Sequence, residues 1–174
     1  MIGKIYTAAL NLYNDGYRPP VGFYFRAGLI DQMALGAVAD FTGVDLAADS
    51  KFQEISGIGM SLEFDEVIEG GYNYVHKLPT QTRFENLVMK RGLVTNGSEF
   101  AEWCIDVIDS GFTQKIQKKS IFVELMAPEN KEPLMFWSFE NVYPVKWEVS
   151  PFNSMETEIV TETLEFVFEN MTVY

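Results

Sequence analysis

In residues 134–149, LMFWSFENVYPVKWEV, every second residue from Met135 to Val149 is apolar except Asn141. Successive side chains of a β-strand point to opposite faces, so this period of two predicts a strand with one buried face. Pro144 cannot donate a ladder hydrogen bond, and we therefore expect the strand to bend near Tyr143 and Pro144. The predicted buried face consists of Met135, Trp137, Phe139, Tyr143, Val145, Trp147 and Val149.

Other segments have the same strand-like composition, rich in β-branched and aromatic residues. They are SIFVELMA, ETEIVTETLEFVFENMTVY and, upstream, VGFYFRAG, FQEISGIGMSLEFDEVIEG and YNYVHKLP. In the C-terminal segment Val160, Leu164, Phe166 and Phe168 share the predicted buried face, whereas Thr161, Thr163, Glu165 and Glu169 form a polar face suited to water. Pro79 predicts a turn after the last upstream segment.

One segment, residues 96–112, has the period of an amphipathic helix. Asn96 and Glu99 predict a capping box at its start, and Gly111 a left-handed residue at its end. Its predicted packing residues are Phe100, Trp103, Cys104, Val107 and Ile108. The Ala-rich residues 31–50 contain two glycines and predict an irregular or partly helical insertion.

We predict a single domain over residues 1–174, because the sequence has many strand-like segments and one helix but no internal repeat and no long linker. The expected fold class is mainly β, an antiparallel barrel or sandwich with a helix packed on it. With 174 residues, of which 47% are hydrophobic, the chain is long enough to bury an ordinary core.

The net charge excludes some classes of partner. Lys and Arg number 13 and Asp and Glu 25, which gives −12 and argues against direct nucleic-acid recognition, because phosphate binding requires a cationic face. Protein partners are expected instead. A single cysteine excludes an internal disulfide, and residues 1–20 resemble neither a signal peptide nor a membrane span, so we expect a cytoplasmic protein.

Candidate catalytic groups are few. His76 is the single histidine and no nucleophile motif accompanies it, while Cys104 lies on the apolar face of the predicted helix. The acidic residues Glu63, Asp65, Glu66 and Glu69 lack the spacing of a calcium loop, and no histidine accompanies them to hold a transition metal. We therefore predict no catalytic, cofactor-binding or metal-binding residues, and a protein that is not an enzyme.

Six segments, read in order, resemble the phage tail tube protein family of contractile injection systems. They are FQEISGI, EFDEVIEGGYNYVHKLP, TRFENLVMKRGL, EFAEWCIDVID, NVYPVKWEV and ETEIVTETLEFVFE. The resemblance runs from about Val21 to Glu169, and EGGYNYVHKLP together with LVMKRGL is its most diagnostic part. This family includes phage tail tubes and the inner tubes of antifeeding-prophage-like particles.

The resemblance implies a tail-tube-type barrel with one flanking helix and an extended β-hairpin, here expected over residues 60–79. It further implies a hexameric ring around a lumen, rings stacked into a tube, and assembly in the cytoplasm. The implied partners are other copies of the chain, adjacent rings, spike, hub and baseplate proteins, and sheath subunits, without a cofactor. The expected subunit-interface residues are Phe64, Glu66, Val67, Tyr72, Tyr74, His76, Lys77, Lys90 and Arg91. Of these, Lys77, Lys90 and Arg91 are expected to meet acidic surfaces of neighbouring copies.

Two segments exceed the usual length of the family, an N-terminal extension over residues 1–15 and an insertion over residues 27–51. Added segments favour a baseplate-proximal tube initiator, with the repeating tube subunit as the alternative. Two other classes stay open: a monomeric ligand-binding β-barrel, which requires an apolar cavity, and a hydrolase that uses His76 or the acidic cluster.

Overall fold

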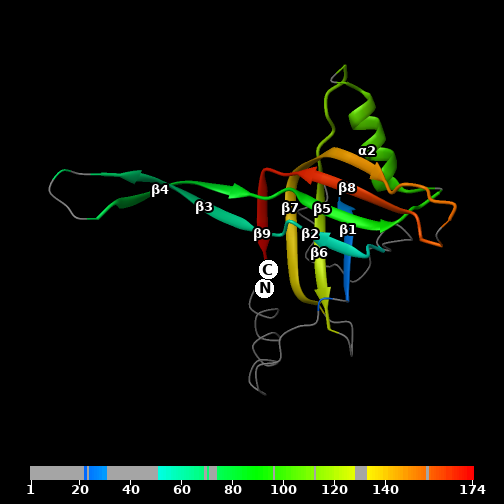
Figure 1. Cartoon of the computed structure of the whole chain (residues 1–174), viewed down its shortest axis with the longest axis horizontal. Coiled ribbons are helices and arrows are strands. Elements are labelled where there is room, and N and C mark those ends of the chain that lie inside the picture. Colours follow the sequence, from blue (N-terminus) through cyan, green and yellow to red (C-terminus); the bar gives the residue numbers. More distant parts are fainter. Residues whose placement is uncertain are drawn as a thin grey trace.

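The computed structural model describes residues 22, 24–30, 51–68, 70, 74–95, 97–111, 113–127, 133–155 and 157–174. These residues form antiparallel strands and one helix, which confirms the predicted fold class (Figure 1). The elements are β1 (Phe25–Ile30), β2 (Glu54–Ser56), β3 (Met60–Val67), β4 (His76–Phe84), β5 (Leu87–Gly92), α2 (Glu99–Asp109), β6 (Lys119–Met126), β7 (Pro133–Val149), β8 (Thr161–Val167) and β9 (Asn170–Val173).

The main sheet has the strand order β1-β6-β7-β8-β5-β2, and β9 also pairs with β7. Each pairing in it is antiparallel. Strands β3 and β4 form a separate two-stranded sheet that projects from this body (Figure 1). We call this hairpin, Met60–Phe84, the arm.

Strand β7 holds the two halves of the main sheet together. Its first part pairs with β6 and β9, and its second part pairs with β8. Asn141, at the junction, has a φ of 55°, and the register with β8 shifts between Pro144 and Lys146. Such irregularities bend a strand, so β7 turns from one half of the sheet into the other near the predicted position.

The same irregularities change which face of β7 is buried, and the predicted single buried face is therefore wrong beyond Asn141. Phe139 is fully buried before this point, but Val142, of the opposite parity, is fully buried after it. Val145 and Trp147 are 42% and 37% exposed. The pairing with β6 has one extra residue of β7 between Phe139 and Val142, and this extra residue reverses the alternation. Met135, nearer the start of the strand, is also exposed.

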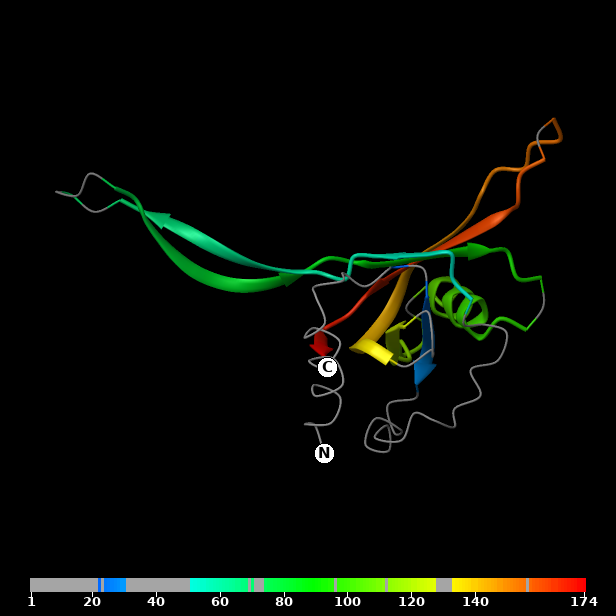
Figure 2. The same cartoon turned by 90° about the horizontal axis from the view of Figure 1, so that it is seen from below.

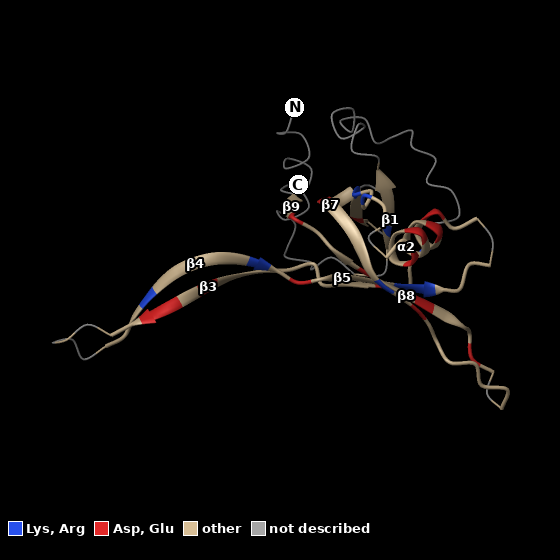
Figure 3. Cartoon of the chain, turned by 90° about the horizontal axis from the view of Figure 1, so that it is seen from above, with Lys and Arg blue, Asp and Glu red and all other residues tan. Residues whose placement is uncertain are grey.

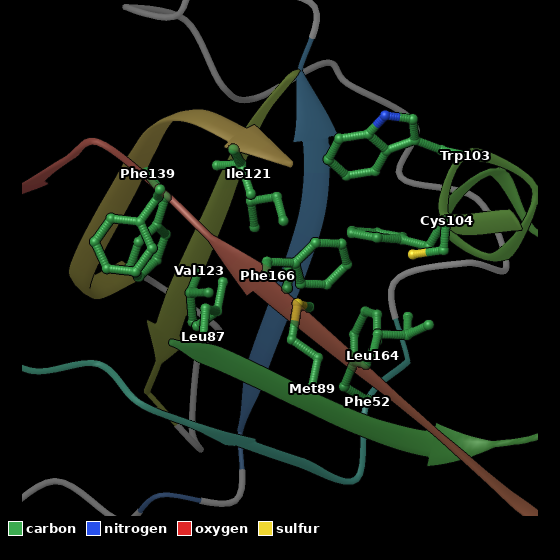
Figure 4. Packing of buried hydrophobic residues seen from close by; sticks show 14 of the residues in the cluster. Phe52, Leu87, Met89, Trp103, Cys104, Ile121, Val123, Phe139, Leu164 and Phe166 are labelled. Atoms are coloured by element: carbon green, nitrogen blue, oxygen red, sulfur yellow. The ribbon is translucent and has the colours of Figure 1, made fainter. Parts of the chain in front are cut away.

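The core lies between the bent halves of the sheet and α2 (Figure 4). Its residues come from alternate positions of the strands, among them Leu87, Met89, Ile121, Leu164 and Phe166, all fully buried. Trp103 of α2 stacks on Phe166, with ring centroids 5.5 Å apart. These side chains fill the interior that a ligand-binding barrel would need to keep open.

Helix α2 begins two residues later than a cap at Asn96 would place it. Its N-cap is Ser98, whose hydroxyl accepts a hydrogen bond from the Ala101 amide at 3.0 Å. Gly111 follows the helix with a φ of 54°, the left-handed conformation expected there. Asn96 lies outside the described residues.

The packing face of α2 is narrower than its sequence period suggests. Phe100, Trp103 and Cys104 are buried and Val107 is partly buried against the core. Ile108, predicted to pack on the core, is instead 46% exposed, because the helix contacts the sheet along a narrow stripe that its position does not reach.

Pro79 does not form a turn, contrary to prediction. It lies inside β4, where it is paired with Phe64, and the register shifts beside this pair between Leu62 and Phe64. In a two-stranded ribbon each strand has an unpaired edge, so a proline without an N–H is tolerated there. The hairpin therefore extends to Phe84 rather than Pro79, and residues 85–86 connect it to β5.

Some predicted features fall on parts of the chain that the structure does not describe. The extension over residues 1–15, residues 31–50 of the predicted insertion, Glu69 and Tyr72 lie outside the described residues. Residues 27–30 of the predicted insertion belong to β1. No helix within the described part of the chain is long and apolar enough to cross a membrane.

Candidate assembly surfaces

A buried ion pair lies where the end of β5 meets the start of β8. The Nε of Arg91 donates to Oε1 of Glu162 at 2.7 Å, and the two side chains are 1% and 0% exposed. Arg91 was expected to meet a neighbouring copy, and this expectation is wrong because its charge is neutralised inside its own chain. A buried arginine requires such a partner, since an unpaired charge in the interior is costly.

The pair connects four parts of the fold. Arg91 also donates to the hydroxyl of Ser98, the N-cap of α2, and its guanidinium lies 5.0 Å from the ring centroid of Phe52. The indole of Trp147 in β7 donates to the second oxygen of Glu162 at 3.1 Å. The network therefore joins the start of the helix to β5, β7 and β8.

The positions of these two charges in the sequence could have predicted the pair. Arg91 has the same parity as Leu87 and Met89 in β5, and Glu162 has the same parity as Leu164 and Phe166 in β8. A charged residue in phase with an apolar face is unusual. Two such residues of opposite sign, on strands that pair, predict a buried ion pair.

The opposite face of the same strands is polar. The register places Glu54, Lys90, Thr163 and Glu148 in one row across β2, β5, β8 and β7, and Ser56, Val88, Glu165 and Lys146 in the next row. These side chains are partly or fully exposed, whereas those of the alternate rows are mostly buried. We call these two rows the polar sheet face.

Opposite charges lie across from one another on the polar sheet face. Lys90 pairs in register with Glu54, and Lys146 with Glu165. The side-chain amide of Asn86 donates to Glu165 at 2.7 Å. Thr163 belongs to the face predicted to be suited to water, and it is partly exposed.

One face of the arm has a run of exposed apolar side chains. Met60, Leu62 and Phe64 alternate with polar residues along β3 and are 57%, 61% and 50% exposed. Exposed Pro79 lies opposite Phe64. We call Met60, Leu62, Phe64 and Pro79 the apolar arm face. A contiguous exposed apolar surface of this kind marks an interaction site.

Four charged residues of the arm are paired with one another across its two strands. On the polar face Glu63 binds Arg83 at 2.9 Å and accepts from the Gln81 amide at 2.7 Å. Lys77 lies 3.7 Å from Glu66, and its ammonium is 4.7 Å from the centroid of the Phe64 ring. Figure 3 shows these charges along the arm, and the acidic residues that follow the outer side of α2.

The predicted interface residues separate into two groups. Phe64, Glu66, Val67, Tyr74, His76 and Lys77 all lie on the arm or in the residues just before β4. Lys90 is on the polar sheet face and Arg91 is buried. The arm residues stay predicted interface residues, and Arg91 is removed from the set.

The two candidate nucleophile–base partners lie on different parts of the molecule. Cys104 is fully buried in α2, where burial, and then the charge of Glu162, raise the pKa of its thiol to about 12. His76 lies on the arm, with its ring centroid 4.9 Å from that of Tyr74. Across the described residues, no group of three or more His, Cys, Asp or Glu side chains is placed to hold a metal ion.

Comparison with known proteins gives one family and several similar folds. A family model described as T4-like virus tail tube protein gp19 matches residues 23–172. No curated protein sequence matches the chain. Among solved structures, a chain of the six-fold-symmetrised cryo-EM structure of the anti-feeding prophage baseplate is 22% identical, with a TM-score of 0.73, and the match covers 91% of this chain and 97% of that chain.

Two further solved structures come from an extracellular contractile injection system named PVC. A chain of its sheath/tube terminator, in the extended state, is 19% identical over 91% of this chain and 99% of that chain, with a TM-score of 0.71. A chain of its sheath-tube complex is also 19% identical, over 94% and 96% of the two chains, with a TM-score of 0.71. The shared fold is that of the tail-tube type.

Proposed function

The chain belongs to the T4-like virus tail tube protein gp19 family, and we propose that it is an inner-tube subunit of a contractile injection system, with its copies closed into a hexameric ring around a lumen. The family is structural, and the chain is not an enzyme. Stacked rings form the tube. The proposed partners are other copies of the chain, baseplate and spike proteins, and sheath subunits, and the proposed place of assembly is the cytoplasm.

The observation that supports this proposal most directly is the apolar arm face. Its residues project on a ribbon away from the core, so no part of the barrel covers them (Figure 1). A two-stranded ribbon is only marginally stable by itself in water. A neighbouring copy that covers this face would remove apolar surface from water and would hold the arm in one position.

The polar sheet face is the proposed wall of the lumen. Its hydroxyl and charged side chains stay hydrated, as the surface of a water-filled channel requires. The opposite side of the same strands is the buried core, so the sheet separates the packed interior from a wet surface. A closed ring of such sheets also pairs strand edges that would otherwise be exposed.

The position of the ring within the particle is the finer part of the proposal. Residues 1–15 and 27–51 exceed the length that is usual in this family. Additional residues favour a ring that contacts another protein besides its own copies, as a baseplate-proximal ring does. The alternative is the repeating tube subunit, which requires self-stacking alone.

Electron microscopy and sedimentation of the purified chain test the proposal. We expect hexameric rings, either single, as for a tube initiator, or stacked into tubes, as for a repeating subunit. The double variant Leu62→Ser, Phe64→Ser should stay folded by circular dichroism but lose assembly. The control is Ser61→Thr, on the opposite face of the arm. A wild-type chain that is monomeric at every concentration would contradict the proposal.

Chemical labelling tests the lumen. The variant Thr163→Cys places a thiol on the polar sheet face, next to Lys90 in the register. In assembled tubes it should react with a small maleimide and resist a bulky polymer-linked maleimide, whereas the unassembled chain should react with both. The control is Glu102→Cys on the exposed side of α2. Rapid reaction of the Thr163→Cys thiol with the bulky reagent in tubes would place this face elsewhere.

A further inference from the structure

The exposed face of α2 combines carboxylates with isoleucines. Glu102, Asp106 and Asp109 lie on this face at positions i, i+4 and i+7, and all three are exposed. Ile105 and Ile108 lie beside them and are 44% and 46% exposed. We call these five residues the outer helix face. The helix packs on the core with its other side, so the outer helix face and the polar sheet face lie on opposite sides of β5 and β8 (Figures 1 and 2).

The carboxylates of the outer helix face have no cation of their own. Glu99, in the first turn, binds Lys119 at 2.8 Å, but Glu102, Asp106 and Asp109 form no ion pair with any residue that the structure describes. The last turn of α2 contains both aspartates and no basic residue. The carbonyl end of a helix is partially negative, so a carboxylate is unfavourable there and a cation is favourable. This end of α2 therefore has negative charge that a partner can neutralise.

A pocket of about 450 Å³ opens beside the same end of the helix. Asp106 and Asp109 line it together with apolar side chains that include Trp103 and Val107. Arginine and lysine have an apolar stem and a charged head, so either side chain matches this combination of walls. Lys115 also lines the pocket, but within the described part of the chain it forms no ion pair with either aspartate.

We infer that the outer helix face binds a basic segment of a different protein, with an arginine or lysine side chain in this pocket and aliphatic side chains on Ile105 and Ile108. The inference names the chemistry of one partner. It rests on the proposed function only for the place of that partner, outside the ring, because the polar sheet face is the proposed wall of the lumen. Opposite charge and exposed apolar surface together favour such a contact.

Another copy of the chain does not fit as the occupant. The net charge is −12, so two copies repel each other unless their few cations are available. Most cations of the described residues are already neutralised within the chain. Seven lysines and arginines form ion pairs with its own carboxylates: Arg26, Lys77, Arg83, Arg91, Lys118, Lys119 and Lys146.

Binding of a synthetic peptide to the unassembled chain tests the inference. The probe is a fluorescein-labelled amphipathic peptide of arginine, leucine and alanine, and fluorescence anisotropy measures its dissociation constant. Asp106→Asn with Asp109→Asn should weaken binding about fivefold at low ionic strength, since two attractive charges are lost. The matched control is Glu85→Gln with Glu158→Gln, which removes two exposed carboxylates elsewhere. Equal weakening by both pairs, or no binding to the wild type, would overturn the inference.

A second peptide tests the contact with the isoleucines. In this peptide alanine replaces every leucine, and the arginines stay in place. Ile105→Ser should weaken binding of the leucine peptide about threefold and leave binding of the alanine peptide unchanged, because only the first buries apolar surface against the helix. Equal effects on the two peptides would overturn this contact.

The stability of the unassembled chain gives an independent measurement. Asp106→Asn with Asp109→Asn should raise the urea midpoint above that of the control pair Glu85→Gln with Glu158→Gln. The change removes two carboxylates that repel each other and the end of the helix. A lower midpoint would show that the aspartates stabilise the chain's own fold, and it would overturn their assignment to a partner.

The outcomes separate this inference from the proposed function. Asp106→Asn with Asp109→Asn should form rings as the wild type does, because no copy of the chain occupies the outer helix face. Loss of ring formation by this folded variant would place the face between copies, which overturns the inference and leaves the tube function standing. A wild-type chain that never assembles but binds the leucine peptide as expected would overturn the tube function and leave the basic partner standing.

Discussion

Arg91 and Glu162 form an ion pair 2.7 Å long with both side chains almost completely buried. Removing one partner leaves the other charge unpaired in the interior, so Arg91→Ala or Glu162→Gln should lower the free energy of unfolding by about 3–5 kcal/mol. Replacing both by apolar residues, Arg91→Met with Glu162→Leu, should cost less than either single change, since no buried charge remains. Urea unfolding of the wild type, the single variants Arg91→Met and Glu162→Leu, and this double variant forms a double-mutant cycle that measures the coupling.

An exposed ion pair provides the control for that cycle. Arg83 and Glu63 lie 2.9 Å apart on the arm, but Arg83 is 66% exposed. Water screens such a pair, and Arg83→Ala should change the free energy of unfolding by less than about 1 kcal/mol. Equal losses for Arg83→Ala and Arg91→Ala would show that burial does not determine the strength of the buried pair.

Two residues of α2 should respond very differently to truncation. Trp103 stacks on Phe166 and donates from its indole to the Gln117 carbonyl at 3.0 Å, so Trp103→Ala should cost about 3–5 kcal/mol of folding free energy. Ile108 lies five residues after Trp103 and is 46% exposed, so Ile108→Ala should cost less than about 1 kcal/mol. Denaturant unfolding of the unassembled chain measures both, and a large loss for Ile108→Ala would contradict the observed packing face.

The thiol of Cys104 should make folding stability depend on pH in the alkaline range. Burial raises its pKa from 9.0 to about 12, so above pH 9 the unfolded chain loses this proton while the folded chain keeps it. Unfolding then releases a proton, and the stability contributed by this group falls as pH rises from 9 towards 12, by about 1.4 kcal/mol per pH unit. Cys104→Ala lacks the group, so its stability should fall less steeply; parallel curves for the two proteins would contradict the assignment.

The sequence predicted the class of fold because alternation and helical period report which side chains face the core. Leu164 and Phe166 were placed correctly in this way, and both are fully buried. Asn141 was not recognised as the point where the buried face changes. Its φ of 55° is a property of the backbone, and the pattern of apolar and polar residues does not indicate it. Pro79 was interpreted as a turn because a proline usually ends a strand. It is tolerated inside a strand that has an unpaired edge, and the sequence does not show that β4 has such an edge.

The candidate surfaces were predictable to different degrees. The hairpin was expected from the family resemblance over residues 60–79, and the pairing of its polar side chains across the ribbon followed only from the observed register. Arg91 was misassigned because Lys90 and Arg91 were interpreted together as a basic pair on the surface. Arg91 has the same parity in β5 as the buried Met89, and this was not considered. The exposed apolar residues between β7 and β8 were not predicted, since Phe152, Met155 and Ile159 lack the alternation that marks a strand and are too few to define a helix.

The connection between the barrel and the arm depends on a glycine with no room for a side chain. Gly57 has a φ of 80°, and a Cβ on it would lie 1.8 Å from the backbone oxygen of Asn86, in the segment that leads from β4 to β5. Gly57→Ala must therefore separate the two segments that hold the base of the arm, besides adopting a left-handed conformation that costs about 1–3 kcal/mol. Gly59→Ala is the matched control, because a Cβ there meets nothing within 4 Å.

We expect Gly57→Ala to lower the free energy of unfolding by more than about 1 kcal/mol. It should also reduce assembly by more than this loss of stability explains, since the arm would leave the barrel at a different angle. Urea unfolding and electron microscopy of both variants measure these effects, and assembly of Gly57→Ala equal to that of Gly59→Ala would show that the direction of the arm does not depend on this contact.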